Sequence, residues 1–400
     1  MSRMLRLILG IALLGAVVGC TSTTAPPSPT AAPTVLPRPT PVDLSAALRI
    51  DEPVAPLGIQ VFLWGNAPTT DRDLQLAKDA GFTWIKQRFE WRYIEPNKKG
   101  EFQWEEPDRI VAAAARHGLK ILARVDNQPK WARSDDLFPG TGPPDDLQDW
   151  ADFLTALATR YRGRIAAYQL WNEPNLDREW GNRPPNAAEY VELLRVGYGA
   201  IKAADPNAIV ITAGMAPTTT NNDNARPDVV FVQQMYDAGA SKYFDMLGVH
   251  GAGFKAPPEA DPGQVAQDPA LTNNDSSPVE QKRVYAFRHV EDLRELMVRN
   301  GDGGKQIAVL EMGWTSDPRP DSPYRWHAVS EEERADYLVR AIRFAREHWR
   351  PWIGVLSLIY LPDPNWTPEM EQYYWSLTRP DGTALPAYEA IRQAFGPAGR

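Results

Sequence analysis

The sequence has few of the residues that build metal centres or disulfide frameworks. Its 400 residues include one cysteine and five histidines. A single cysteine excludes a disulfide framework and any zinc site that needs two or four cysteines. The His-Glu-x-x-His motif of metalloproteases is absent from the sequence as well. These counts disfavour a metalloprotease.

Basic charge is scarce too. The chain has 43 Lys and Arg residues against 51 Asp and Glu, a formal net charge of −8. No basic stripe interleaved with aromatic residues is visible, so we expect no nucleic-acid partner. Aromatic residues are plentiful in contrast, with 14 Trp and 14 Tyr. Such rings build large cores, and their flat faces also stack against sugars.

Long apolar runs are missing as well. The longest, residues 7–18, spans about 18 Å as a helix, which is too short to cross a hydrocarbon core of about 30 Å. Arg3 and Arg6 precede this run, and Gly19 and Cys20 follow it. The pattern resembles the lipobox of bacterial lipoproteins, in which the cysteine is lipidated and becomes the new N-terminus. We expect a signal peptide over residues 1–19 and lipidation of Cys20; the alternative is a plain secretory signal with an unrelated cysteine.

A segment rich in proline and threonine follows. Residues 21–41 contain seven prolines, six threonines and no acidic residue. This composition cannot bury a core, and it is typical of a disordered, extended spacer. We therefore expect a lipid-anchored linker over residues 20–50. A domain over residues 51–400 would then be held outside the cytoplasm, at the cell membrane or cell surface.

The remaining chain alternates strand and helix patterns. Short apolar runs predict eight buried parallel strands, at residues 58–64, 82–89, 120–125, 166–171, 208–213, 246–251, 306–311 and 353–360. Amphipathic windows predict the helices, at residues 70–80, 107–117, 147–161, 187–204, 228–238, 278–299, 330–348 and 386–395. Ser330 and Glu333 form a capping-box pattern at the start of one of them.

This alternation predicts an α/β fold, a single (β/α)₈ TIM barrel. A doubly wound sheet is the competing architecture. Such a sheet normally carries a glycine-rich phosphate turn after its first strand, and none is present here.

Two glutamates stand at the ends of predicted strands. Glu173 follows the fourth strand, and Glu311 ends the seventh. Burying a carboxylate in an apolar core costs free energy, so such a residue needs a reason to be there. In barrels the active site lies at the carboxyl ends of the strands. One such glutamate alone would more simply form an ion pair with an arginine. A pair of them indicates a site.

The sequences around both glutamates resemble a known group of enzymes. Residues 171–174 read Trp-Asn-Glu-Pro and residues 310–314 read Leu-Glu-Met-Gly-Trp. They look like the two signatures of the large (β/α)₈ barrel clan of retaining glycoside hydrolases, which includes cellulases, β-xylosidases and α-L-iduronidases. The resemblance runs from about residue 58 to the end of the chain.

The resemblance implies a role for each matching residue. Glu173 would be the general acid/base and Glu311 the nucleophile, because retaining hydrolysis needs one protonated and one ionised carboxyl group. Arg88 would be the cation that keeps Glu311 charged; its alternative is a salt bridge to Glu90 or Glu95. Asn172 would donate a hydrogen bond to the 2-hydroxyl of the sugar.

Weaker matches and departures complete the expected site. His250 would line it, and Trp131, Trp314 and Tyr360 would contact the sugar. Tyr360 stands where relatives often carry a tryptophan. Ala252 stands where relatives often carry a tyrosine that bonds the nucleophile.

The sequence therefore predicts a tethered glycosidase that cleaves O-glycosidic bonds of an oligo- or polysaccharide by double displacement, with carbohydrate as its partner. This mechanism requires no cofactor and no metal. Two alternatives stay open. One is a catalytically inactive carbohydrate-binding lipoprotein, and the other is a transglycosidase on the same barrel.

Overall fold

The computed structural model describes residues 47–397. The expected signal peptide, the lipidation site at Cys20 and most of the expected linker lie outside the described residues. Within residues 47–397, no helix is long and apolar enough to cross a bilayer.

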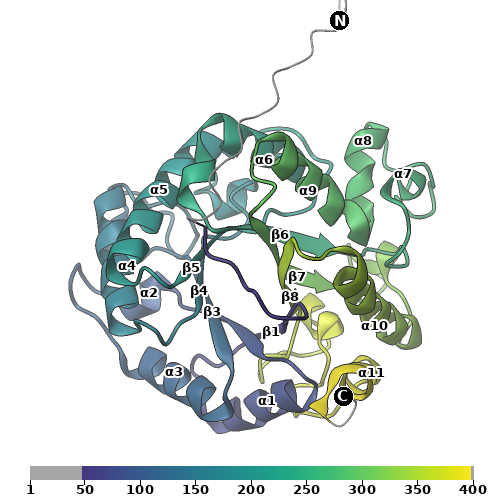
Figure 1. Cartoon of the computed structure of the whole chain (residues 1–400), viewed down its shortest axis with the longest axis horizontal. Helices are drawn as coiled ribbons and strands as arrows, with labels where there is room; N and C mark the ends of the chain where they lie inside the picture. Colours follow the sequence, from purple (N-terminus) through teal and green to yellow (C-terminus); the bar gives the residue numbers. More distant parts are fainter. Residues whose placement is uncertain (1–46, 398–400) are drawn as a thin grey trace, which may run out of the picture. The chain divides into compact units, whose positions relative to one another are not determined.

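Eight parallel strands close into a barrel in the order β1 to β8, with β8 paired to β1 (Figure 1). This confirms the predicted (β/α)₈ architecture. The strands are β1 (Leu57–Val61), β2 (Trp84–Arg88), β3 (Lys120–Val125), β4 (Ala167–Leu170), β5 (Ile209–Thr212), β6 (Met246–Ala252), β7 (Gln306–Gly313) and β8 (Ile353–Leu358).

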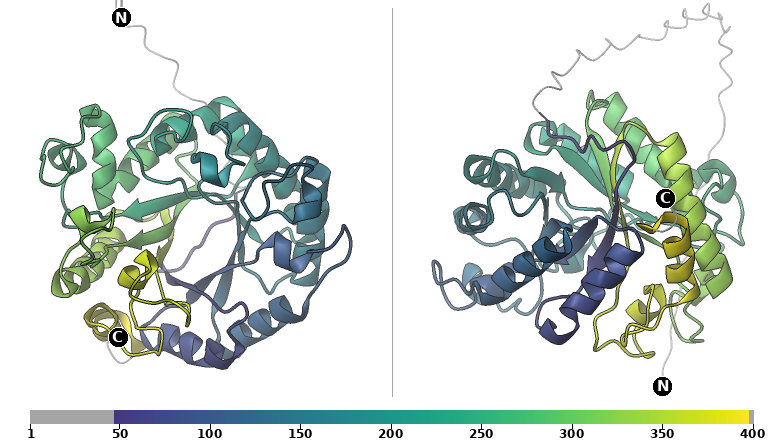
Figure 2. Two further views of the ribbon diagram at one scale, coloured as in Figure 1. Left: turned by 180° about the vertical axis from the view of Figure 1, so that it is seen from behind. Right: turned by 60° about the horizontal axis from the view of Figure 1, so that its bottom comes forward.

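Helices surround the barrel in a ring (Figures 1 and 2). They are α1 (Ala67–Asp79), α2 (Trp91–Ile94), α3 (Glu105–His117), α4 (Leu147–Arg160), α5 (Ala187–Ala204), α6 (Asp228–Asp237), α7 (Pro262–Val265), α8 (Val279–Lys282), α9 (Val290–Arg299), α10 (Glu331–His348) and α11 (Pro386–Phe395). The capping box at the start of α10 is formed as its sequence predicts, because Ser330 and Glu333 each bond the backbone of the other.

The single helix predicted over residues 278–299 is wrong. The chain forms α8, two 3-10 turns and α9 instead, and extended backbone at Ala286 (φ −107°, ψ 140°) separates the pieces. This break turns Phe287 and His289 inward, where both are buried. Burying these two side chains stabilises the broken form, and this compensates for the helical hydrogen bonds that are lost at the break.

Strand alternation fills the inside of the barrel. Successive side chains point to opposite faces of a strand, so residues two apart share a face. Trp84 and Leu122 belong to the buried cluster inside the barrel. Lys86 and Arg124 follow each of them by two positions on β2 and β3 and are buried as well. Lys86 and Arg124 therefore lie inside the barrel, next to the apolar cluster and nearer the carboxyl ends of the strands.

The described chain begins at the amino ends of the strands. The backbone N–H of Leu48 bonds Asp245, and that of Ile50 bonds Gln306 at the start of β7. Figure 1 shows this first segment, in purple, running across the end of the barrel. Ile50 is buried against the inner cluster of the barrel.

Candidate active site

A cavity of about 490 Å³ lies at the carboxyl ends of the strands. Glu173, just after β4, and Glu311, in β7, both line it, although 138 positions separate them. Both side chains reach solvent, with exposed fractions of 17% and 16%. The two carboxylates that the sequence singles out thus share one open cavity.

The backbone around Glu173 is strained. Trp171 and Glu173 have φ values of 73° and 43°, in the left-handed region that side chains rarely adopt. This twist sends the Trp171 ring outward, where it packs against Trp150 and Trp180. Asn172 and Glu173 turn to the cavity instead. The strained backbone conformation thus directs the Glu173 carboxylate toward the cavity.

Glu173 has one contact on each oxygen. Nδ1 of His250 lies 3.1 Å from Oε1 of Glu173. The exposed Arg178 donates a 3.3 Å hydrogen bond to Oε2. The carboxyl group is held from both sides, and it still borders the cavity.

Glu311 is surrounded by positive groups. Lys86 donates a 2.7 Å hydrogen bond to Oε1, Arg124 lies 3.7 Å from the same oxygen, and Nε2 of His250 lies 3.9 Å away. Burial alone would raise the pKa of Glu311. The charges of Lys86, His250 and Arg124 outweigh it and lower the pKa to about 2. Glu311 is therefore ionised at neutral pH.

Lys86 stays charged despite its burial. Burial lowers the pKa of Lys86 to about 8, and the charge of Glu311 opposes this change. The ammonium form therefore still predominates at neutral pH. Arg124 is in turn held by Asp126, to which its Nε donates at 2.5 Å.

The expected role of Arg88 is wrong. Its guanidinium lies 3.2 Å from Glu90 and 3.8 Å from Asp126, and it does not line the cavity. Arg88 occupies the last position of β2, one step of the alternation beyond Lys86. At the end of the strand, Arg88 lies beside the acidic side chains of Glu90 and Asp126. The structure therefore shows the alternative, a salt bridge to Glu90.

His250 reaches both carboxylates because of a β-bulge. On β6 and β7, Val249 pairs with Val309, but His250 pairs with Glu311, so Leu310 has no partner opposite it. A bulge of this kind re-aims the following side chain, and here it brings Glu311 level with His250. Gly214 makes room for the imidazole, since a Cβ there would lie 2.2 Å from Cδ2 of His250.

Two other expected residues line the cavity. Asn172 is buried, and its Oδ1 accepts a 3.3 Å hydrogen bond from Gln169. Tyr360, after β8, is half-buried and packs edge-on against Phe62 and Trp366. Ala252, where the resemblance led us to expect a tyrosine, also borders the cavity.

Trp314 and Trp131 do not reach the cavity. Trp314 is completely buried, and its indole donates to the carbonyl of Ala256. Gly253 presses against its ring, where a Cβ would come within 1.9 Å. Trp131 packs edge-on against Trp91 and bonds the Glu95 carbonyl. The expectation of sugar contact is wrong for Trp314, because packing covers its ring completely. Trp131 is half-buried and does not line this cavity, and its contact with sugar stays a prediction.

Sequence reasoning missed Lys86 and Arg124. A signal was present, since a lysine and an arginine inside buried parallel strands must find partners. It also missed Glu179, which lines the cavity from the loop after β4. Burial raises the pKa of Glu179 to about 7, and the negative charge of Glu173 adds to this while Arg124 opposes it. No sequence pattern marked Glu179.

The site is an ionic cluster in which cations hold carboxylates. Within residues 47–397, no group of three or more His, Cys, Asp or Glu side chains is placed to hold a metal ion. One ionised carboxylate and a second carboxyl group facing the same cavity can perform nucleophilic attack and proton transfer.

The sequence of residues 50–285 matches the model of the cellulase family, glycosyl hydrolase family 5. The chain belongs to this family. The match covers β1 to β6 and includes Asn172, Glu173 and His250. No curated protein sequence matches this family 5 chain.

Solved structures share the fold. A family 39 glycoside hydrolase from Bacteroides cellulosilyticus WH2 aligns with a TM-score of 0.64 at 19% identity, over 86% of this chain and 64% of its own. A glucosidase from Croceicoccus marinus aligns at 0.62 and 12% identity, over 88% and 69%. Xylanase 10B from Thermotoga petrophila RKU-1 aligns at 0.57 and 13% identity, over 85% and 94%. At these identities the likeness shows the barrel alone, and the family 5 chain spans under two thirds of the first of these proteins.

Proposed function

We propose that this family 5 protein is a retaining glycoside hydrolase that cleaves O-glycosidic bonds of an oligo- or polysaccharide. The observation that carries the proposal is the shared cavity, in which His250 contacts both Glu173 and Glu311. Retaining enzymes hold their two carboxyl groups about 5–5.5 Å apart, closer than inverting enzymes do. A single imidazole bridging the pair favours the retaining arrangement.

In the first step, Glu311 attacks the anomeric carbon while Glu173 gives its proton to the leaving oxygen. The C–O bond breaks, and a glycosyl ester forms on Glu311. Its Oε1 carries the contacts to Lys86, Arg124 and His250. Within residues 47–397, Oε2 has no hydrogen-bond or ion-pair partner, so we assign the attack to Oε2.

In the second step, Glu173 removes a proton from water, which attacks the anomeric carbon. The ester bond breaks, and Glu311 leaves as a carboxylate. Asn172 borders the same cavity, where a hydrogen bond to the 2-hydroxyl would strengthen as charge develops on the sugar. The cluster of cations around Glu311 keeps it ionised at the start and at the end of the cycle.

Aryl glycosides with leaving groups of graded acidity test these roles. We expect Glu311→Ala to abolish turnover of every substrate, because the attacking atom is gone. Glu173→Ala should retain partial activity only on the most acidic leaving groups, which need little protonation. Glu295→Ala, on the exposed face of α9, is the matched control and should keep parental rates. If Glu173→Ala lost the same fraction of activity on good and poor leaving groups, Glu173 would not be the general acid.

The stereochemistry and the acceptor can be read in the same assay. Proton NMR of the first product should show the anomeric configuration of the substrate. Product masses separate hydrolysis from transfer to a second sugar. A parental protein that binds glycans but turns over no glycoside would instead be a binding lipoprotein.

We also propose that the protein is anchored outside the cytoplasm through a lipid on Cys20. The support is the apolar run at residues 7–18 and the cysteine that follows it. Metabolic labelling with a radioactive fatty acid should mark the parental protein and leave Cys20→Ala unlabelled. Equal labelling of both would contradict the anchor.

A further inference from the structure

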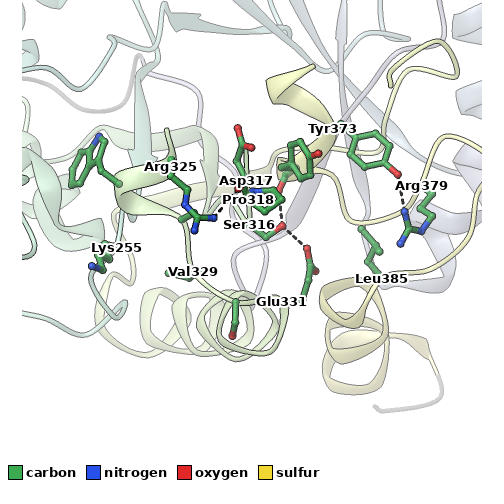
Figure 3. A pocket seen from close by; sticks show the side chains of 14 residues that line it. Lys255, Ser316, Asp317, Pro318, Arg325, Val329, Glu331, Tyr373, Arg379 and Leu385 are labelled. Carbon is green, nitrogen blue, oxygen red and sulfur yellow. Dashed lines mark hydrogen bonds between the residues drawn. The ribbon is translucent and has the colours of Figure 1, made fainter. Parts of the chain in front are cut away.

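A second cavity, of about 600 Å³, adjoins the catalytic one. It lies between the loop after β7, the start of α10 and the 3-10 turn at Glu371–Trp375. Figure 3 shows Lys255 and Arg379 on opposite sides of this cavity, with Arg325 between them. The catalytic glutamates do not line it.

Three cations of this cavity are not neutralised. Lys255, Arg325 and Arg379 are all exposed, and none forms an ion pair within residues 47–397. Arg325 donates to the carbonyl of Pro318, and Arg379 donates to the hydroxyl of Tyr373; both acceptors are neutral. The three side chains therefore keep their full charge toward the cavity.

The acidic residues of the cavity are already paired. Asp317 lies 2.6 Å from Arg319, and Glu331 lies 2.7 Å from Arg334. The cavity consequently has a surplus of positive charge on a protein whose net charge is −8. A ligand that supplies carboxylate or sulfate groups would complete these contacts, since a guanidinium binds such groups in a bidentate manner.

Aromatic side chains give the cavity faces on which a sugar ring can lie. Trp326, Tyr373 and Tyr374 line it, and each is half-buried, so part of every ring is accessible. The Trp326 ring is held in place by a stacked contact with Phe254, at 6.0 Å between centroids. Fixed aromatic faces beside charged hydrogen-bond donors are the lining that an acidic sugar requires.

The two cavities share a wall. Phe254, Tyr324 and His327 line the catalytic cavity, whereas their chain neighbours Lys255, Arg325 and Trp326 line the second one. In the turn at Glu371–Trp375, Tyr373 and Tyr374 line the second cavity, and the other three residues line the catalytic one. The two cavities therefore lie next to each other, on opposite sides of these segments.

We propose that the second cavity binds a negatively charged sugar unit of the substrate, which makes the substrate an acidic polysaccharide. The proposal rests on the glycosidase function proposed above and adds a substrate class to it. The negative group is a carboxylate or a sulfate, and the experiment distinguishes these two sources.

Affinity electrophoresis in gels that contain polysaccharide tests the proposal on the full chain. One pair of gels contains polygalacturonate or its fully methyl-esterified form, and a second pair contains glucuronoxylan or its carboxyl-reduced form. A third pair compares carrageenan with agarose. We expect at least one acidic polymer to slow the protein, and its uncharged form to slow it at least tenfold less at equal concentration. Slowing by the first two pairs indicates carboxylate, and slowing by the third indicates sulfate.

The triple variant Lys255→Gln/Arg325→Gln/Arg379→Gln should lose this slowing. The matched control Lys78→Gln/Arg299→Gln/Arg343→Gln removes the same charge from exposed positions on α1, α9 and α10 and should keep it. Trp326→Ala, which changes no charge, should weaken it. The proposal is wrong if no acidic polymer slows the parental protein, if both triple variants lose the effect equally, or if the cavity variant keeps it.

Hydrolysis of an aryl glycoside separates this proposal from the function on which it rests. The parental protein and the matched control variant should hydrolyse an aryl glycoside with kcat/KM values within twofold of each other, because Lys78, Arg299 and Arg343 line neither cavity. Slowing by an acidic polymer without turnover of any glycoside would contradict the glycosidase function alone. Turnover of an aryl glycoside without slowing by any acidic polymer would contradict the second cavity's role alone.

Discussion

The ammonium nitrogen of Lys86 and Oε1 of Glu311 lie 2.7 Å apart inside the barrel, although 225 positions separate the two residues along the chain. Lys86 is 1% exposed, so water screens this pair poorly. The contact explains why Glu311 remains a carboxylate in a buried setting. It also places the supporting cation deeper in the barrel than Arg88.

Replacing Lys86 should move the acid limb of the pH–rate profile. Attack requires ionised Glu311, and the charge of Lys86 favours that form, so Lys86→Gln raises the pKa of Glu311 above about 2. Activity should then fall at a higher pH on acidification, by about one pH unit or more. Profiles of kcat/KM measure this shift, with circular dichroism to confirm folding. Arg88→Gln is the matched control on the same strand; an equal shift in that variant would contradict the assignment.

Glu179 should titrate near neutral pH. Burial raises its pKa to about 7, so between about pH 6 and 8 this carboxyl group changes charge beside Glu173 and Arg124. We expect kcat/KM of the parental enzyme to show an ionisation in this range that is missing from Glu179→Gln. Glu295→Gln on α9 should leave the profile unchanged. A profile that is the same in Glu179→Gln and the parental enzyme would show that Glu179 has no influence on the reaction.

Activity should require a glycine at position 214. An added methyl group would lie 2.3 Å from Nε2 of His250, so the imidazole would have to move away from both glutamates. We expect Gly214→Ala to lower kcat/KM by about 10- to 100-fold, because small displacements of catalytic groups are costly. Gly199→Ala is the control: nothing lies within 4 Å of its Cβ, and in helix α5 it should raise stability by about 0.5–1 kcal/mol. Equal activity of the two variants would contradict the role given to His250.

The stability of the barrel should depend on His289. Burial would lower the pKa of His289, but the charge and hydrogen bonds of Asp228, together with Asp292, raise it to about 10. A pKa raised on folding adds stability that is complete below the unfolded value of about 6.5 and is lost as the pH rises through about 10. We expect His289→Gln to lower the free energy of unfolding by about 3–5 kcal/mol at pH 6, and by much less near pH 10.

Urea unfolding at pH 6, 8 and 10 measures this difference. His348→Gln is the control, since that side chain is half exposed at the end of α10. A loss of stability in His289→Gln that is the same at all three pH values would mean that the ion pairs of His289 are not its source.

Much of the fold could be predicted because its signals are local. The bounds of β3, α5 and α11 agree with the predicted ranges to the residue. Strand runs, caps and helix periodicity depend on neighbours only a few positions away. The helix predicted over residues 278–299 failed because burial of Phe287 and His289 by distant parts of the chain outweighed its local pattern.

The sequence by itself determined the alternation of strands and helices, and therefore that Glu173 and Glu311 stand at the same end of one barrel. Only the tertiary structure decided that Lys86 and Arg124 accompany Glu311, that Arg88 meets Glu90, and that Trp314 is covered. Partners of this kind depend on how far each strand is shifted along its neighbour and on the bulge at Leu310. Those shifts arise only when the sheet closes, and no stretch of neighbouring residues encodes them.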